Sequence, residues 1–94
     1  MDNLQLSNHF YLYEFINSQV AERNGIDNMP SPEILENIKL LCLNVLEPAR
    51  NMLGSAIRIS SGYRCKKLNT LIGGSKLSQH MKGQAADCQV PIRN

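Results

Sequence analysis

The sequence predicts a small α+β domain in which N-terminal helices pack on a small, mainly antiparallel sheet. Apolar residues recur at steps of three and four up to Gly54, which is the spacing of buried helix faces. After Gly54 they alternate with polar residues, which is typical of strands. The chain has 94 residues, of which 43% are hydrophobic, and this size and composition fit one globular domain over residues 1–94. The class therefore combines a helical first half with strands in the second.

Two helices are expected before Gly54. The first spans residues 11–23 and is stopped by the turn at residues 24–25. The second is long, because Ser31 suits its N-cap and the next stop signal is Gly54. Pro48 is expected to kink it, since proline has no backbone donor and crowds the preceding turn. The expected buried stripe of this helix contains Ile34, Ile38, Leu41, Val45, Ala49 and Met52.

Two strands are expected after Gly54. Residues 56–60 alternate, so Ile57 and Ile59 should face inward. Residues 65–72 are long enough for two helical turns, and residues 75–83 have the composition of an exposed loop. Residues 85–90 are expected to form a second, buried strand that Pro91 stops.

Composition excludes several classes of protein. The net charge is +2, but Asp87 is the sole acid after residue 47, so the second half is strongly basic. The longest apolar run is residues 40–43, which is far below the roughly 20 residues of a membrane span. No cationic stretch leads into an apolar run at the N-terminus, so synthesis in the cytoplasm is expected. The three cysteines form no CxxC pair, which argues against a disulfide framework.

His80 and Asp87 are the first candidates for chemistry. His80 lies in a loop rich in Ser and Gly, and Asp87 lies in the strand that follows it. An imidazole nitrogen and a carboxylate oxygen together form half of a common zinc site, although a surface His beside a salt-bridged Asp would give the same spacing. Arg64 follows the first strand, and its guanidinium could pair with Asp87 or with the carboxylate of a substrate. His9 is interpreted as a surface or capping residue.

The segment of residues 78–87 fits the pattern SxHxxGxAxD. In this pattern, and in a series of shorter segments over residues 6–87, the chain resembles the zinc D-alanyl-D-alanine carboxypeptidase family. That family also includes D,D-dipeptidases and the L-alanyl-D-glutamate endopeptidases of phage endolysins. The shorter segments are Leu6-Ser7, Tyr13-Glu14-Phe15, Gly25-Ile26-Asp27-Asn28, Leu46-Glu47-Pro48, Ser61-Gly62-Tyr63-Arg64, Leu68-Asn69 and Gly73-Gly74-Ser75.

The resemblance implies a role for each matching residue. His80 and Asp87 would be the first two zinc ligands. Arg64 would be catalytic, binding the carboxylate of the substrate or polarising its carbonyl. Ser78 and Gln79 would line the substrate site, with Ser78 as a positioning hydroxyl because no base is placed to activate it. The implied cofactor is zinc, and the implied substrate is the D-amino-acid-containing stem peptide of peptidoglycan.

The chain departs from the family after Asp87. Members take a third ligand, a His, and a general-base Glu from a later segment, whereas residues 88–94 contain neither. The domain is therefore expected to be an incomplete version of the fold. His9 folding back, or a partner chain, could supply the missing ligand. Cys88 should not, because neighbouring strand residues point to opposite faces.

Two readings of function therefore stay open at this point. The first is a zinc-dependent peptidase of peptidoglycan. The second is a catalytically inactive derivative that binds a partner protein, such as a phage-encoded protein acting on a host component. A phage or prophage product would reach the cell wall by another route than a signal peptide. An open sheet edge would also allow a homo-oligomer.

Two further chemistries are disfavoured by the residues around them. Nucleic-acid binding ranks last, because Tyr63 is the sole aromatic residue in the basic half and bases would have little to stack on. Cys65 lies between Arg64 and Lys66, which favour a thiolate, so a Cys–His peptidase with His80 is conceivable. A thiol with a structural role on a short helix is the preferred interpretation of Cys65, and Cys42 is expected in the core.

Overall fold

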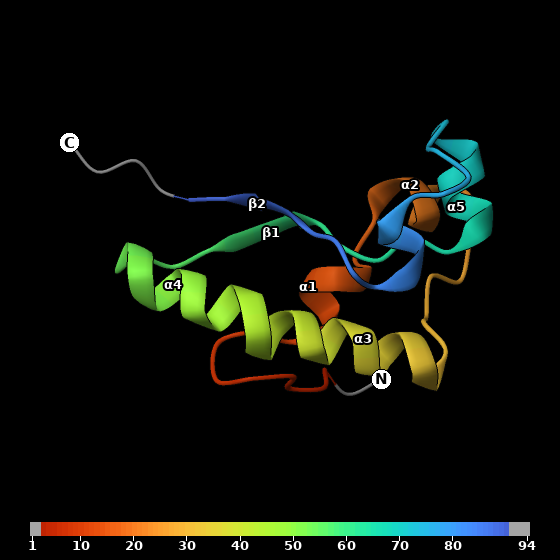
Figure 1. The fold of residues 1–94 in the computed structure, drawn as a ribbon. Coiled ribbons are helices and arrows are strands. Elements are labelled where there is room, and N and C mark those ends of the chain that lie inside the picture. Colours follow the sequence, from red (N-terminus) through yellow and green to blue (C-terminus); the bar gives the residue numbers. More distant parts are fainter. Residues whose placement is uncertain (1–2, 91–94) are drawn as a thin grey trace.

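The computed structural model describes residues 3–90 and confirms the α+β class (Figure 1). Helices occupy most of the first half, and two short strands and two short helices follow. In chain order the elements are α1 (Leu12–Ile16), α2 (Gln19–Arg23), α3 (Pro32–Leu41), the π-helical segment η1 (Cys42–Leu46), α4 (Glu47–Leu53), β1 (Arg58–Ser61), α5 (Lys66–Leu71), the 3-10 helix η2 (Gln79–Lys82) and β2 (Asp87–Gln89).

The single helix expected over residues 11–23 is two helices, α1 and α2. Asn17 and Ser18 between them are extended, and the Ser18 hydroxyl accepts a hydrogen bond from the Ala21 amide at 3.2 Å. Serine competes with the helical backbone in this way, so it starts a new helix rather than continuing the old one. Because α1 ends early, the Phe15 carbonyl is free and accepts the Tyr63 amide of the segment after β1 at 2.7 Å.

Segments α3, η1 and α4 form one continuous helical rod (Figure 1). Ser31 caps it, as predicted, by accepting from the Ile34 amide, and Gly54 ends it with φ +62°. The disturbance expected from Pro48 takes the form of a π turn, in which the Glu47 amide donates to the Cys42 carbonyl. A wide turn directly before proline accommodates a ring that has no donor.

The π turn also changes which face of the rod is buried. Ile38, Cys42 and Leu46 are buried at steps of four, whereas Val45 and Met52 from the expected stripe are exposed. The extra residue in the wide turn rotates the following positions about the helix axis, so the α-helical spacing fails beyond it. Aromatic and aliphatic side chains from the N-terminal segment, from α1 and from β1 with its flanking residues complete the core: Leu6, Phe10, Leu12, Phe15, Ile57, Ile59 and Tyr63.

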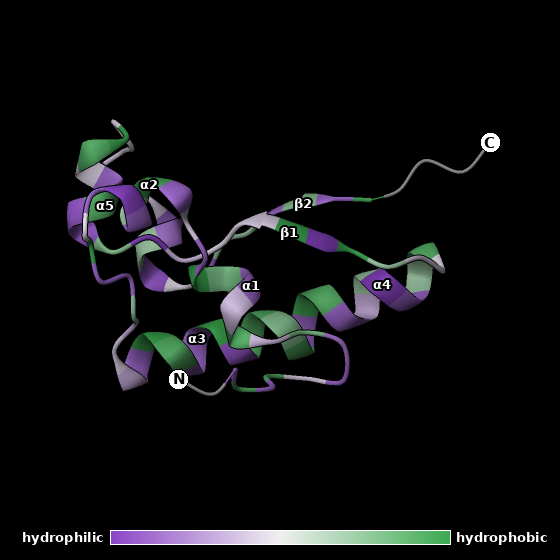
Figure 2. Ribbon diagram, turned by 180° about the vertical axis from the view of Figure 1, so that it is seen from behind, coloured by the Kyte–Doolittle hydropathy of each residue, from purple (hydrophilic) through white to green (hydrophobic). Residues whose placement is uncertain are grey.

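The sheet has two antiparallel strands, β1 and β2. Ile59 pairs with Cys88 and Ser61 with Asp87, with a bulge between them. Ile57 and Ile59 are buried, as predicted, but the prediction of a buried second strand is wrong, because all three residues of β2 are exposed. Helix α1 packs on β1, and among residues 3–90 no helix covers β2 to the same extent. In the hydropathy view, hydrophobic residues colour parts of the rod, α1 and β1, which contribute to the core (Figure 2).

Within residues 3–90, no helix combines the length and apolar character that a bilayer span requires.

Candidate metal centre

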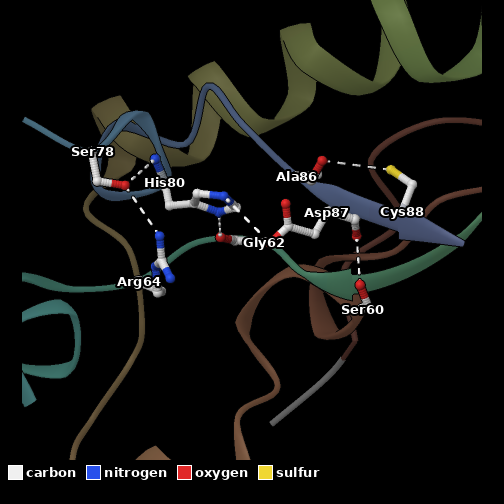
Figure 3. Close-up of polar contacts among 8 residues, drawn as sticks. All are labelled: Ser60, Gly62, Arg64, Ser78, His80, Ala86, Asp87 and Cys88. Carbon is white, nitrogen blue, oxygen red and sulfur yellow. Dashed lines mark hydrogen bonds and ion pairs between the residues drawn. The ribbon is translucent and has the colours of Figure 1, made fainter. Parts of the chain in front are cut away.

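The His80 ring is fixed by the segment that follows β1. Its Nδ1 lies 2.7 Å from the Gly62 carbonyl oxygen (Figure 3). A carbonyl can only accept, so Nδ1 carries a proton, and in the neutral form of the ring the lone pair is on Nε2. The Ser78 hydroxyl caps the short helix η2 by accepting from the His80 amide at 3.2 Å. These two contacts thus orient the imidazole so that Nε2 is the nitrogen that can bind a metal.

Asp87 faces this free nitrogen from the first position of β2. Its Oδ2 lies 3.7 Å from His80 Nε2 (Figure 3). This separation exceeds the range of a hydrogen bond but is near the roughly 3.3 Å between two ligands of one tetrahedral zinc ion with bonds of about 2.0–2.1 Å. The Asp87 side chain is 66% exposed and the His80 side chain is 14% exposed. Asp87 is therefore accessible from solvent, contrary to the buried carboxylate that the sequence suggested.

Arg64 contacts the same segment without pairing with Asp87. Its amide donates to the His80 carbonyl at 3.1 Å, and its Nη2 donates to the Ser78 hydroxyl at 3.2 Å. The sequence left two partners open for Arg64, which were Asp87 and the carboxylate of a substrate. The pairing with Asp87 is wrong, because the Asp87 carboxylate faces His80. The Arg64 Nε is buried and has no hydrogen-bond partner among the described residues.

Ser78 and Gln79 lie at the entrance to η2. The Ser78 hydroxyl accepts from both Arg64 and the His80 amide, which agrees with a positioning role. Gln79 is exposed, and its carbonyl accepts the Gln84 amide at 3.1 Å, which closes the loop that leads to β2. Four of the five candidate residues therefore lie within one chain of contacts, and Gln79 adjoins it.

Two residues that sequence reasoning assigned no role hold this arrangement in place. Asn28 is buried and donates to the carbonyls of Ile16 and Tyr63, while its Oδ1 accepts the Cys65 amide at 2.8 Å. Gly62 lies so close to α1 that a Cβ there would approach Phe15 Cα to 2.6 Å. Both residues lie in segments that resemble the family. That resemblance was the signal in the sequence that could have identified them.

His9 does not complete the centre. Its Nδ1 lies 2.7 Å from Glu47 Oε1, and its amide donates to Glu47 Oε2 at 2.8 Å. The suggestion that His9 folds back onto the centre is therefore wrong. Over residues 3–90, no three His, Cys, Asp or Glu side chains come together in a way that could hold a metal. Cys88 points away from Asp87, as expected, and its thiol donates to the Ala86 carbonyl (Figure 3).

The other two cysteines have structural roles. Cys65 caps α5, with its sulfur accepting the Leu68 amide at 3.5 Å. The idea of a Cys–His peptidase is wrong, because both ring nitrogens of His80 face other groups, Gly62 and Asp87. Cys42 is fully buried in the core, and this burial raises the pKa of its thiol to about 12.

The donor set suits zinc. One imidazole nitrogen, one carboxylate oxygen and a backbone carbonyl that orients the imidazole are ordinary parts of zinc centres. A small α+β fold that brings these groups together beside an arginine agrees with a metallopeptidase-like protein. The sequence profile of the Peptidase M15 family matches residues 8–94, so the chain belongs to that family of zinc metallopeptidases. Searches of curated proteins and of solved structures found no match.

Proposed function

We propose that the chain acts as a zinc-dependent peptidase on peptides that contain D-amino acids, such as the stem peptides of peptidoglycan. The observation that supports this most directly is the 3.7 Å approach of His80 Nε2 to Asp87 Oδ2, with the lone pair of Nε2 directed by the Gly62 contact. Membership of the Peptidase M15 family supports the reaction class. The D-amino-acid substrate is inferred from the resemblance of the SxHxxGxAxD segment.

In this proposal each residue of the centre has one task. His80 and Asp87 hold zinc, and a bound zinc ion supplies the Lewis acidity that polarises a carbonyl and lowers the pKa of water. Arg64 binds the substrate through its guanidinium group, while the Ser78 hydroxyl accepts a hydrogen bond from Nη2 and holds that group in place. Gln79 lines the substrate site next to Ser78. A third ligand and a general base come from a partner chain.

The second candidate function is a catalytically inactive derivative that binds a partner protein. It is favoured by the pairing of only two metal-ligating side chains among the described residues. Two ligands give a weak zinc site, and hydrolysis without a positioned base is slow. Both candidates allow the chain to be a phage-encoded product.

Zinc content separates the metalloenzyme from other proteins of this fold. We expect about one zinc per chain in protein purified without chelator, or about one per two chains if a second copy completes the centre. His80→Ala should lose this zinc, because it removes the nitrogen ligand. His9→Ala is the matched control and should keep it, since His9 contacts Glu47 instead. Elemental analysis showing less than about a tenth of a zinc per wild-type chain would exclude a metal centre.

Hydrolysis then separates the enzyme from the inactive derivative. Purified peptidoglycan and synthetic stem peptides are incubated with zinc-loaded protein, and released amino acids and fragments are identified by mass spectrometry. We expect release by the wild type and by His9→Ala and none by His80→Ala. A wild type that holds zinc but releases nothing would support the inactive, partner-binding derivative.

A further inference from the structure

A cleft of about 580 Å³ runs along β1, outside the candidate metal centre. Its floor is the continuous segment of residues 58–64, and its walls come from α2 and α5, which lie side by side beyond one end of the strand (Figure 1). Gly62 and Arg64 belong to both the cleft and the centre, because the Gly62 carbonyl holds His80 and Arg64 holds Ser78. The cleft therefore adjoins the metal centre through these two residues.

The charge of this cleft is entirely of one sign. Arg23, Arg58 and Arg64 line it, and no Asp or Glu does. Over residues 3–90, none of the three arginines forms an ion pair, since both ion pairs present involve histidines. Arg23 Nε donates a hydrogen bond to the Gln19 carbonyl, and Arg64 Nε has no hydrogen-bond partner among the described residues. Three guanidinium groups with unused donors favour carboxylates, which they bind through charge-assisted, often bidentate hydrogen bonds.

One edge of β1 is also unpaired. Within the described chain β1 pairs with β2 alone, and the backbone of residues 58–61 bonds to no other segment. A strand with a free edge can accept an extended peptide as an additional strand. A nucleic acid fits less well, because the sole aromatic lining residue, Tyr63, is 8% exposed and offers no face on which a base could stack.

We propose that this cleft binds an extended peptide bearing at least two carboxylates, which pairs with the free edge of β1 and meets Arg23, Arg58 and Arg64. The inference rests on the proposed peptidase function in that the cleft and the metal centre share Gly62 and Arg64. It assigns Arg23 and Arg58 as specificity-determining residues on the approach to the centre. The bound segment is thus the part of the substrate remote from the bond that is cleaved.

Binding of an acidic peptide tests the charge argument. The probe is a fluorescein-labelled hexapeptide that alternates glutamate with threonine, and its counterpart has glutamine at each glutamate. Fluorescence polarisation is measured in EDTA at low salt, so that neither zinc nor cleavage affects the result. We expect the glutamate peptide to bind at least about tenfold more tightly, with the difference shrinking as salt screens the charges. Equal affinities for the two peptides would overturn the proposal.

Substitutions locate the binding site. The double variant Arg23→Gln with Arg58→Gln should bind the glutamate peptide about tenfold or more less tightly than the wild type. Lys39→Gln with Lys76→Gln removes the same charge from exposed positions outside the cleft and should change binding by less than about twofold. Equal losses in the two double variants would show attraction by net charge alone and overturn the site. A single-stranded oligonucleotide of equal charge that binds more tightly than the peptide would overturn the assignment in favour of nucleic acid.

The backbone argument has its own test. N-methylation of alternate amides in the glutamate peptide should weaken binding, and methylation of the other set should weaken it less, because one set faces β1. Unchanged binding of both methylated peptides would refute strand pairing. Failure of the peptidase function, by contrast, would show as missing zinc or missing cleavage while the glutamate peptide still binds in EDTA.

Discussion

The chemistry of His80 is decided by a backbone atom rather than by another side chain. The Gly62 carbonyl holds the proton on Nδ1 and turns Nε2 toward Asp87. Gly62 reaches that position because it has no side chain: α1 passes so close that Phe15 Cα and O lie 2.6 and 2.7 Å from where a Cβ would stand. One glycine thus connects the packing of α1 to the orientation of a metal-binding imidazole.

We therefore expect Gly62→Ala to destabilise the fold through this contact. The added methyl meets backbone atoms that cannot rotate away, so the free energy of unfolding should fall by about 3 kcal/mol. Gly54→Ala is the matched control, because Gly54 has φ +62° but nothing within 4 Å of the new Cβ. Its cost is that of a left-handed alanine, roughly 1–2 kcal/mol. Urea denaturation measures both variants, and equal losses would contradict the contact argument.

At the scale of elements, the break between α1 and α2 shapes the site. It frees the Phe15 carbonyl for the Tyr63 amide and the Ile16 carbonyl for Asn28. Both contacts fasten the segment after β1, which carries Gly62 and Arg64. A helix uninterrupted from residue 11 to 23 would use these carbonyls internally and leave that segment unattached.

Ser18 starts the second of these helices, so its loss should be measurable. Ser18→Ala removes the acceptor of the Ala21 amide and should lower the free energy of unfolding by about 1 kcal/mol. Ser18→Asp keeps an acceptor at the N-cap and should stay close to the wild type. Thermal and urea unfolding measure the difference, and a neutral Ser18→Ala would mean that the cap contributes nothing to the break.

Glu47 ties the N-terminal loop to the long helical rod. Burial raises the pKa of its carboxyl, but the neighbouring Ser7 hydroxyl and His9 lower it by more, and the resulting pKa is below its ordinary value of 4.5. His9 supplies the direct hydrogen bonds, at 2.7 and 2.8 Å, whereas Ser7 Oγ lies nearby without one. The ionised carboxylate is thus the form that stabilises this junction.

The lowered pKa predicts a sign for the pH dependence of stability. A carboxyl with a lower pKa in the folded state contributes stability above its unfolded pKa, near 4.5, and loses it as the pH falls through the folded value. Glu47→Gln has no such titration, so its free energy of unfolding should decline less between pH 7 and pH 3. Urea unfolding at several pH values measures this. Parallel pH profiles of the two proteins would refute the role of Glu47.

At the scale of the whole molecule, the candidate centre lies at the thinly supported side of the fold. The core lies between the rod, α1 and β1, whereas β2 is exposed along all three residues. Asp87 therefore belongs to the least covered element, and His80 to a short 3-10 helix. The outer edge of β2 is also where a homo-oligomer through the sheet would form, and this remains a prediction.

Hydrogen exchange should report this uneven support. We expect amides of β2 to be protected at least about tenfold less than those around Ile38 and Cys42, because local opening exposes few apolar contacts there. Zinc should slow exchange in β2 and η2 of the wild type and leave His80→Ala unchanged, since binding stabilises the closed state. Mass spectrometry follows both effects. Equal protection of β2 and the rod would contradict this account.

Much of this molecule follows from its sequence. The change of period at Gly54 predicted the α+β class, Ser31 and Gly54 predicted the ends of the rod, and Ile57 and Ile59 predicted the inward face of β1. The SxHxxGxAxD segment named His80 and Asp87, and the structure places them face to face. These features are local, because caps, alternation and motif spacing depend on residues close together in the chain.

Tertiary structure decided what depends on distant segments. The break after α1 leaves two carbonyls free to accept hydrogen bonds from the Tyr63 amide and the Asn28 side chain. The π turn before Pro48 rotates the buried face of the rod. Neither feature follows from local spacing. His9 pairs with Glu47 instead of the metal centre, and β2 is exposed because no helix covers it as α1 covers β1. The sequence by itself determined which groups carry the chemistry. Only the packing of α1 against Gly62 decided how His80 is turned, because a tautomer is set by a neighbour in space.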